Sequence, residues 1–117
     1  MVLTIDERDG VAIVRISDDI TQENIPEFAE FFRDQVNPKF DRVVLDMRDV
    51  DYFCSSAYGV MLRCLEATRG RGGEMVLANV GESVRRLFEV TRLTSVIALE
   101  ASEEAAVKRV QKRKGSR

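Results

Sequence analysis

Two adjacent serines, Ser55 and Ser56, are the residues of this chain whose type and position could most readily carry chemistry. They follow Cys54 and precede Ala57, where an apolar run gives way to a helical pattern. The first backbone N–H groups of a helix have no intrahelical partner, and the helix dipole favours negative charge there. A phosphate on either serine would therefore be accommodated, while the alternative is that one serine simply caps the helix.

Histidine is absent from the chain, and two cysteines occur, Cys54 and Cys64. Without histidine the chain cannot assemble a Ser-His-Asp or Cys-His catalytic set, nor an imidazole zinc site. These absences count against an enzyme, and we predict no catalytic residues, no cofactor and no metal site. The cysteines are predicted to be reduced thiols with one of them buried, and a reactive Cys54 at the helix start is the alternative.

Three acids, Asp46, Asp49 and Asp51, lie close together just before the serine pair. Carboxylate oxygens are ligands that Mg²⁺ accepts, so the cluster could indicate a metal site for phosphoryl transfer. No phosphate-binding loop accompanies the acids in the sequence. We therefore interpret them as turn residues and solvated charge.

The composition is typical of one globular domain spanning residues 1–117. With 44% hydrophobic residues and a net charge of −2, the chain can build a core and has no strong field toward nucleic acid or membrane. It lacks an apolar run of roughly 20 residues and a secretion-signal pattern, so we expect a cytoplasmic protein without membrane insertion or direct nucleic-acid binding. A basic C-terminal run is interpreted as a solvated helix end. Its members are Lys108, Arg109, Lys112, Arg113 and Lys114.

Apolar runs and turn signals predict five strands. Two of them flank the turn residues Asp9-Gly10 and should pair as an antiparallel hairpin. Three later runs are almost continuously apolar, which is typical of strands buried on both faces. The predicted strands cover residues 2–5, 11–16, 43–47, 75–78 and 96–99.

Helical spacing of apolar residues predicts four helices between and after these strands. The first, over 25–36, begins either with an Asn24–Glu27 capping box or at Thr21. The last begins at a Ser102 cap. The third helix, 82–92, should face inward through Val84, Leu87, Phe88 and Thr91. The second should do so through Ala57, Val60, Met61, Cys64, Leu65 and Thr68. The order β-β-α-β-α-β-α-β-α predicts a single α/β domain with a mostly parallel sheet.

The arrangement resembles the STAS domain, which bacterial anti-sigma factor antagonists (anti-anti-sigma factors) share with the cytoplasmic tails of sulfate transporters. The resemblance covers nearly the whole chain. It rests on the strand order, an Asp46-x-x-x-Val50 stretch, the serine pair opening a helix, and Gly59 in the first turns of that helix. Residues 84–93 are similar to the third helix of the family, and residues 16–21 to its loop before the first helix.

The resemblance implies a non-enzymatic partner switch in transcription regulation. In antagonists of this family, an anti-sigma factor that is also a serine protein kinase phosphorylates the second hydroxyl residue of an Asp-Ser-Ser/Thr-Gly motif. Carried onto this chain, that residue is Ser56. The implied partner-binding residues are Cys54, Ser55, Ser56, Ala57, Tyr58 and Thr21.

The chain departs from the family pattern at four positions. Cys54 and Ala57 replace the Asp and Gly of the motif, and Asp18 and Thr21 stand where a Gly and an Asp are expected. The alternative function is therefore a STAS regulatory subunit of a membrane transport complex, and a third is a nucleotide-binding protein with a flavodoxin-like sheet. Of the residues near the serines, Tyr58 and Arg63 are expected on the outer face of the helix, and Phe31 and Phe53 partly exposed.

Overall fold

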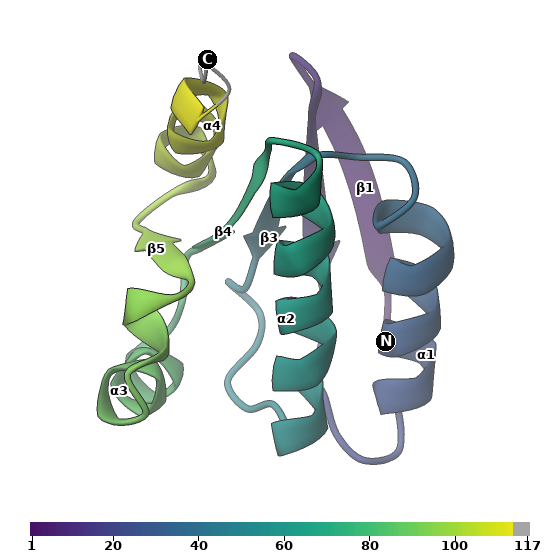
Figure 1. The fold of residues 1–117 in the computed structure, drawn as a ribbon. Helices are drawn as coiled ribbons and strands as arrows, with labels where there is room; N and C mark the ends of the chain where they lie inside the picture. The colour runs from purple at the N-terminus through teal and green to yellow at the C-terminus, as the bar shows by residue number, and fades with distance from the viewer. Residues whose placement is uncertain (114–117) are drawn as a thin grey trace.

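The structure is a computed structural model that describes residues 1–113, with side chains up to Gln111. Of the predicted basic run, Lys114 and the side chains of Lys112 and Arg113 lie outside this part. The core is a five-stranded sheet in the order β1-β2-β3-β4-β5, in which β1 and β2 are antiparallel and the other neighbours parallel (Figure 1). This arrangement confirms the predicted mostly parallel sheet with an N-terminal hairpin. The strands are β1 (Leu3–Arg8), β2 (Val11–Ile16), β3 (Arg42–Asp46), β4 (Glu74–Ala78) and β5 (Ala98–Glu100).

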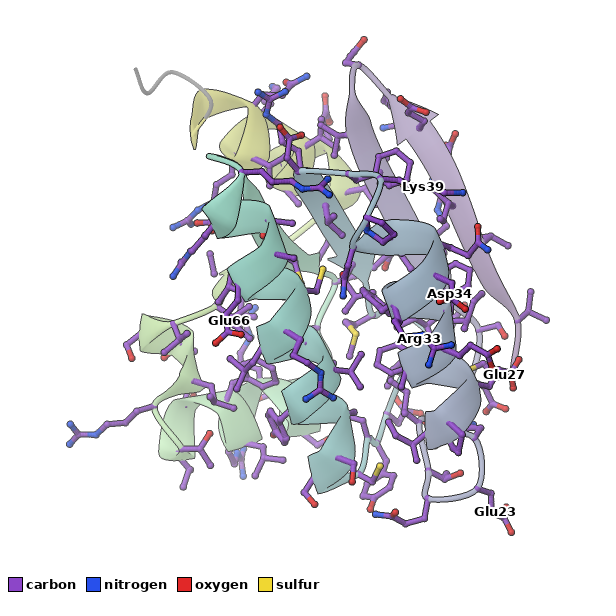
Figure 2. All side chains as sticks on the ribbon, turned by 45° about the vertical axis from the view of Figure 1, so that its right-hand side comes forward. Glu23, Glu27, Arg33, Asp34, Lys39 and Glu66 are labelled. Atoms are coloured by element: carbon purple, nitrogen blue, oxygen red, sulfur yellow. The ribbon has the colours of Figure 1, made fainter. Side chains whose placement is uncertain are left out.

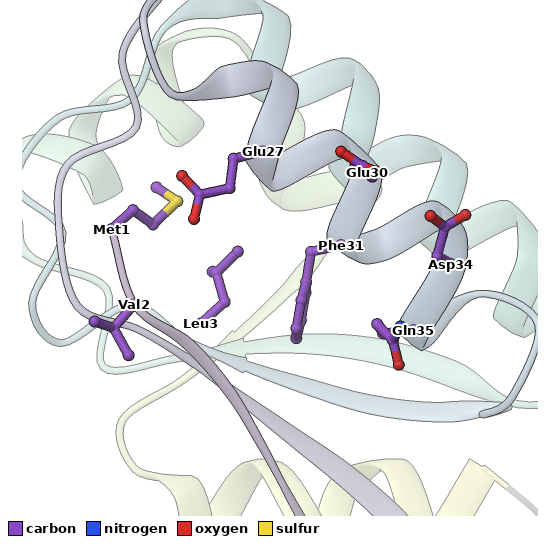
Figure 3. Close-up of a pocket in the computed structure, with 8 residues that line it drawn as sticks. All are labelled: Met1, Val2, Leu3, Glu27, Glu30, Phe31, Asp34 and Gln35. Atoms are coloured by element: carbon purple, nitrogen blue, oxygen red, sulfur yellow. The ribbon is translucent and has the colours of Figure 1, made fainter.

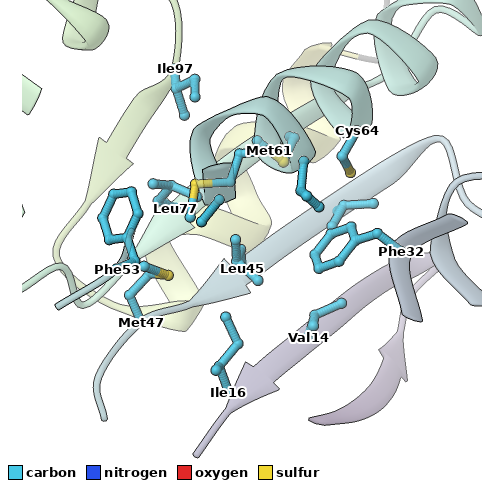
Figure 4. Packing of buried hydrophobic residues seen from close by; sticks show 14 of the residues in the cluster. Val14, Ile16, Phe32, Leu45, Met47, Phe53, Met61, Cys64, Leu77 and Ile97 are labelled. Atoms are coloured by element: carbon cyan, nitrogen blue, oxygen red, sulfur yellow. The ribbon is translucent and has the colours of Figure 1, made fainter. Parts of the chain in front are cut away.

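Helices cover both faces of the sheet, which explains why its central strands are apolar on both sides. One face packs beneath α1 and α2, with α3 at its edge, and the other beneath α4. Residues of β2 alternate accordingly: Ala12 and Val14 join the first cluster, shown in part in Figure 4, whereas Val11 and Ile13 join the second. The α-helices are α1 (Ile25–Phe31), α2 (Ser55–Gly70), α3 (Glu82–Val90) and α4 (Glu103–Arg113).

The second helix follows the sequence pattern closely. All six residues of its predicted inner face are buried. The helix ends at Gly70, and the chain turns through Gly72, whose φ of 83° lies in the left-handed region, into β4. The predicted cap of α4 is also confirmed, because the Ser102 hydroxyl accepts a hydrogen bond from the Ala105 N–H at 3.1 Å.

The helical range 25–36 is confirmed, and of the two starts considered it is Thr21 whose side chain accepts hydrogen bonds there, from the N–H groups of Glu23 (3.2 Å) and Asn24 (3.4 Å). The Asn24 side chain does not cap α1. It accepts a hydrogen bond from the Thr21 N–H (2.7 Å) and donates one to the Asp19 carbonyl (2.9 Å), so it holds the preceding loop instead. After Phe31 the helix widens into a π-helical segment, η1 (Phe32–Val36), whose first and last side chains are both buried.

The third helix is shorter than predicted and buries fewer residues. Val84 and Phe88 are buried, but Leu87 is 43% exposed and Thr91 is also exposed. The prediction was wrong for these two residues because α3 packs at the edge of the domain and contacts the core only through a narrow apolar stripe, Val84 and Phe88. The strand expected at 96–99 is confirmed as β5, but it begins two residues later, at Ala98, after a 3-10 turn, η2 (Leu93–Ser95).

We predict that Gly73→Ala destabilises the fold. A Cβ at Gly73 would overlap the backbone carbonyl of Asp41, which already accepts the Glu74 N–H at 3.0 Å to start β4. Backbone must shift to relieve this overlap, and we expect the free energy of unfolding to fall by about 2 kcal/mol or more in urea denaturation. The matched control is Gly70→Ala, which meets nothing within 4 Å. It should be neutral or slightly stabilising, and equal losses in both variants would contradict the argument.

Candidate functional site

The site is built where two loops join at the carboxyl ends of β2 and β3. The Ile20 N–H donates to the Tyr52 carbonyl (3.0 Å), and the Cys54 N–H donates back to the Ile20 carbonyl (2.8 Å). These bonds form a one-residue parallel bridge between Ile20 and Phe53. The loop that contains Thr21 and the first turn of α2 are therefore held at the same end of the molecule.

A single carboxylate reinforces this junction. One oxygen of Asp19 accepts hydrogen bonds from the backbone N–H groups of Asp51 (2.8 Å) and Tyr52 (3.1 Å). The two loops are thus joined by side-chain as well as backbone bonds, and each bond satisfies a loop N–H group that no strand pairs.

The helix start presents two serines to solvent. Cys54 is the residue before the first turn of α2, with extended φ and ψ of −73° and 162°, and Ser55 and Ser56 are the first two helical residues. Both serines are exposed, and neither side chain caps the helix. The cap interpretation of the pair is therefore wrong, and both hydroxyls stand on the surface at the positive end of the helix dipole.

The flanking residues of the motif point inward. Cys54 is 2% exposed and Ala57 is fully buried, so their side chains belong to the core and not to the surface that the serines occupy. Cys64 is fully buried as well, and both thiols are free. The expectation of one buried cysteine is corrected to two, because the Ile20–Phe53 bridge draws the start of α2 into the core.

Tyr58 and Phe53 also lie deeper than expected. The Tyr58 ring packs against Phe53 (centroids 4.6 Å apart) and against Phe88 of α3 (5.5 Å), and Phe53 is only 4% exposed. Burial raises the pKa of Tyr58, and its hydroxyl is enclosed without a hydrogen-bond partner among residues 1–113. Tyr58 therefore links α2 to α3 and offers little surface to a partner. Arg63 is exposed, as expected.

An apolar hollow beside the serines was missed by sequence reasoning. It has a volume of about 220 Å³, and its walls include Tyr52, which is 55% exposed, and Leu87 of α3. Exposed apolar surface of this kind favours contact with another protein. The available signal was the shortness of this helix, which carries four apolar residues, Val84, Leu87, Phe88 and Val90, although only Val84 and Phe88 are buried.

A larger hollow, of about 510 Å³, lies between the start of β1 and α1 (Figure 3). Phe31, which is partly buried, faces it together with Leu3, and Glu27, Glu30 and Asp34 stand along its α1 side. Phe31 is partly exposed, as expected, but it faces this hollow, whereas Thr21 and the residues 54–58 at the start of α2 do not line it. It is therefore a separate feature of the surface.

The three acids before the serines do not converge. Within residues 1–113 no group of three cysteine, aspartate or glutamate side chains is placed to hold a metal ion. Asp46 is buried and accepts hydrogen bonds from the Arg48 N–H (2.9 Å) and from the side chain of Asn79 (3.1 Å), whereas Asp49 and Asp51 are exposed. Asp46 therefore stabilises the turn after β3.

Glu103, at the start of α4, lines the same small hollow as Asp46. Burial and this second carboxyl raise the pKa of Asp46. Glu103 is held in turn by Arg15, whose guanidinium donates to both of its carboxylate oxygens at 2.7 and 2.9 Å, and this fork lowers the pKa of Glu103 to about 2. The ionised member of the pair is thus Glu103, and Asp46 is the member that holds a proton more readily than usual.

We predict that Asp46→Asn stabilises the protein at neutral pH. The asparagine oxygen can keep both bonds that Asp46 accepts, while its NH₂ group can donate to Glu103 without a second negative charge. Because the pKa of Asp46 is raised in the fold, its contribution is favourable at low pH and is lost as the pH rises through that pKa. In urea denaturation, the free energy of unfolding of the variant should exceed that of the unsubstituted protein by about 1 kcal/mol at pH 7. The difference should be small at pH 4.

Asp49→Asn is the control for that measurement, since Asp49 is an exposed carboxylate close by. A gain of the same size in both variants would reflect net charge alone. A gain for Asp46→Asn that does not change between pH 4 and pH 7 would also contradict the proposed role of the carboxyl pair.

Both thiols should resist labelling in the native protein. Burial raises the pKa of Cys64 to about 12, so this thiol stays protonated at pH 8, and the Cys54 side chain is out of contact with solvent. We expect a disulfide reagent at pH 8 to modify neither cysteine until denaturant is added, when two thiols should react. Rapid native labelling of Cys54 would show instead that the start of α2 opens.

No helix within residues 1–113 has the length and apolar character that crossing a bilayer requires. Residues 3–106 match the family model described as the STAS domain. A candidate anti-sigma factor antagonist of Bordetella bronchiseptica, BtrV, is 32% identical over 106 residues, which are 91% of each chain. An anti-sigma-B factor antagonist of Bacillus subtilis is 33% identical over 61 residues, 52% of this chain and 56% of that one.

Among solved structures, that of a candidate anti-sigma factor antagonist from Thermotoga maritima superposes with a TM-score of 0.84 at 23% identity. The match covers 93% of this chain and 94% of that one. It shows that the two proteins have the same fold, including the order of strands and helices that positions the serine pair.

Proposed function

Because this chain belongs to the STAS domain family, we propose that it is an anti-sigma factor antagonist that works by protein–protein contact in the cytoplasm. Its partner is an anti-sigma factor that is also a serine protein kinase. The unmodified protein binds this partner and so frees a sigma factor, and phosphorylation of Ser56 ends the binding. The relatives with antagonist names support the role.

The observation that carries the proposal is the pair of exposed hydroxyls on the first turn of α2, next to an apolar hollow. A kinase needs a hydroxyl that it can reach, and Ser56 offers one that no cap bond occupies. A partner that binds here can cover both the serines and the apolar walls formed by Tyr52 and Leu87. Binding and phosphorylation would then use the same surface.

Phosphorylation at this position changes charge without disturbing the fold. A phosphoserine carries about −1.5 to −2 charges at neutral pH. The first turn of α2 contains no acidic residue, and its N–H groups and dipole favour an anion, so the modified helix should stay folded. Phosphorylation instead weakens binding to the partner, because the partner would have to desolvate this charge against an apolar surface.

We predict that Ser56→Ala binds the kinase partner as the unmodified protein does and that Ser56→Asp binds at least about tenfold more weakly. A tenfold loss corresponds to about 1.4 kcal/mol of binding free energy. The measurement is a pull-down with the three proteins, identification of the captured partner, and titration with the purified partner. Ser55→Ala is the matched control, since it removes the neighbouring hydroxyl and should leave phosphorylation intact.

Site mapping after incubation of the purified partner with ATP and Mg²⁺ completes the test. Phosphate on Ser56 is the expected result, and phosphate on another residue, or none, would contradict the proposed switch. Capture of a subunit of a membrane transport complex by all three proteins would favour the alternative function instead.

A further inference from the structure

Ser56 and Arg63 lie in one row along the exposed side of α2. They are seven residues apart, close to two full turns, so their side chains project in nearly the same direction. The residue between them on this side is Gly59, which has no side chain. Ser55 is eight residues from Arg63 and projects in a clearly different direction. Of the two serines, Ser56 is therefore the one whose direction matches that of Arg63.

The Arg63 side chain extends toward the N-terminus of α2 and lies over Gly59, which has no side chain. Both terminal nitrogens of its guanidinium lie 3.8 Å from the position that a Cβ on Gly59 would occupy. This direction, toward the N-terminus of the helix, is the usual one for long helical side chains. Positions three residues apart on a helix have Cβ atoms roughly 5–6 Å apart, so the guanidinium already covers most of the distance to Ser56.

The Arg63 guanidinium is also uncommitted. Its side chain is exposed, and the ion pairs of residues 1–113 do not include it. Arg63 and Arg33 both line a groove between α1 and α2. Arg33 is by contrast bound to Asp34 at 2.9 Å and to Glu30 at 3.9 Å. Figure 2 shows Arg33 and Asp34 together on this side of the molecule. One of the two cations in the groove is thus free to accept an anion.

We propose that Arg63 binds the phosphate group when Ser56 is phosphorylated, and that the bare backbone at Gly59 provides the path for this contact. The inference rests on the proposed phosphorylation of Ser56. A guanidinium fork can donate two parallel hydrogen bonds to a phosphate, which fixes the position of the group. The modified helix would then present a phosphate in one defined place, directly over the surface that the partner contacts.

The direction of the side chains favours Ser56 over Ser55. Ser56 projects in nearly the same direction as Arg63, whereas Ser55 projects about 80° away from it. Both serines are neighbours of Gly59, where the guanidinium lies, so the difference between them is one of degree.

The test uses full-length protein with phosphoserine incorporated during translation at position 56 or position 55, so that it does not depend on any kinase. The titration of the phosphate is followed by ³¹P NMR. A nearby guanidinium stabilises the dianion, so the second pKa of the phosphate on Ser56 should rise by about half a unit or more in Arg63→Gln. The same substitution should shift the pKa of phosphate on Ser55 less.

Arg33→Gln is the matched control, because it removes the other guanidinium of the groove, which Asp34 and Glu30 already hold. It should move the phosphate pKa little. The inference is overturned if Arg63→Gln leaves the titration of phosphate on Ser56 unchanged, or if Arg33→Gln shifts it equally. Such a result would leave the proposed function standing, whereas failure of the kinase to modify Ser56 would remove that function without changing this titration.

Discussion

The backbone bridge between Ile20 and Phe53 is the constraint on which the rest of the site depends. It fastens two loops that approach from different strands, and it carries Phe53 and Cys54 into the core while the chain turns into α2. Once those residues are fixed, the helical path brings Ala57 inward and leaves the serines outside. Asp19 accepts two more hydrogen bonds at the same place, so the loop that leads to the exposed hydroxyls is held by side-chain as well as backbone bonds.

The sequence predicts the fold well where one local pattern has one structural solution. The apolar stripe of α2, the hairpin around Asp9-Gly10 and the Ser102 cap are of this kind, because each depends on residues within a few positions. The serine pair is similar, since a helix start follows from local pattern. Its place beside the Thr21 loop depends on the bridge between Ile20 and Phe53, which are far apart in the chain.

Errors occur where partners are distant in the chain. The burial of Phe53 depends on Ile20, and that of Tyr58 depends on α3, neither of which periodicity can show. Leu87 has the spacing of an inner residue, but the edge position of α3 leaves it exposed. Asp46 lies at the end of β3 and Glu103 at the start of α4, far apart in the chain. The sequence therefore predicts the role of Asp46 in its turn but not the effect of Glu103 on its pKa.

Because Cys54 and Ala57 point inward, the segment 54–57 serves two surroundings at once, the solvent and the core. What an approaching protein meets at the helix start is two hydroxyls, a backbone and an apolar rim. What the interior meets is a thiol and a methyl group. Residue choice at positions 54 and 57 is therefore governed by volume and polarity inside the domain. A substitution at either position would therefore change the interior of the domain and leave the two exposed hydroxyls in place.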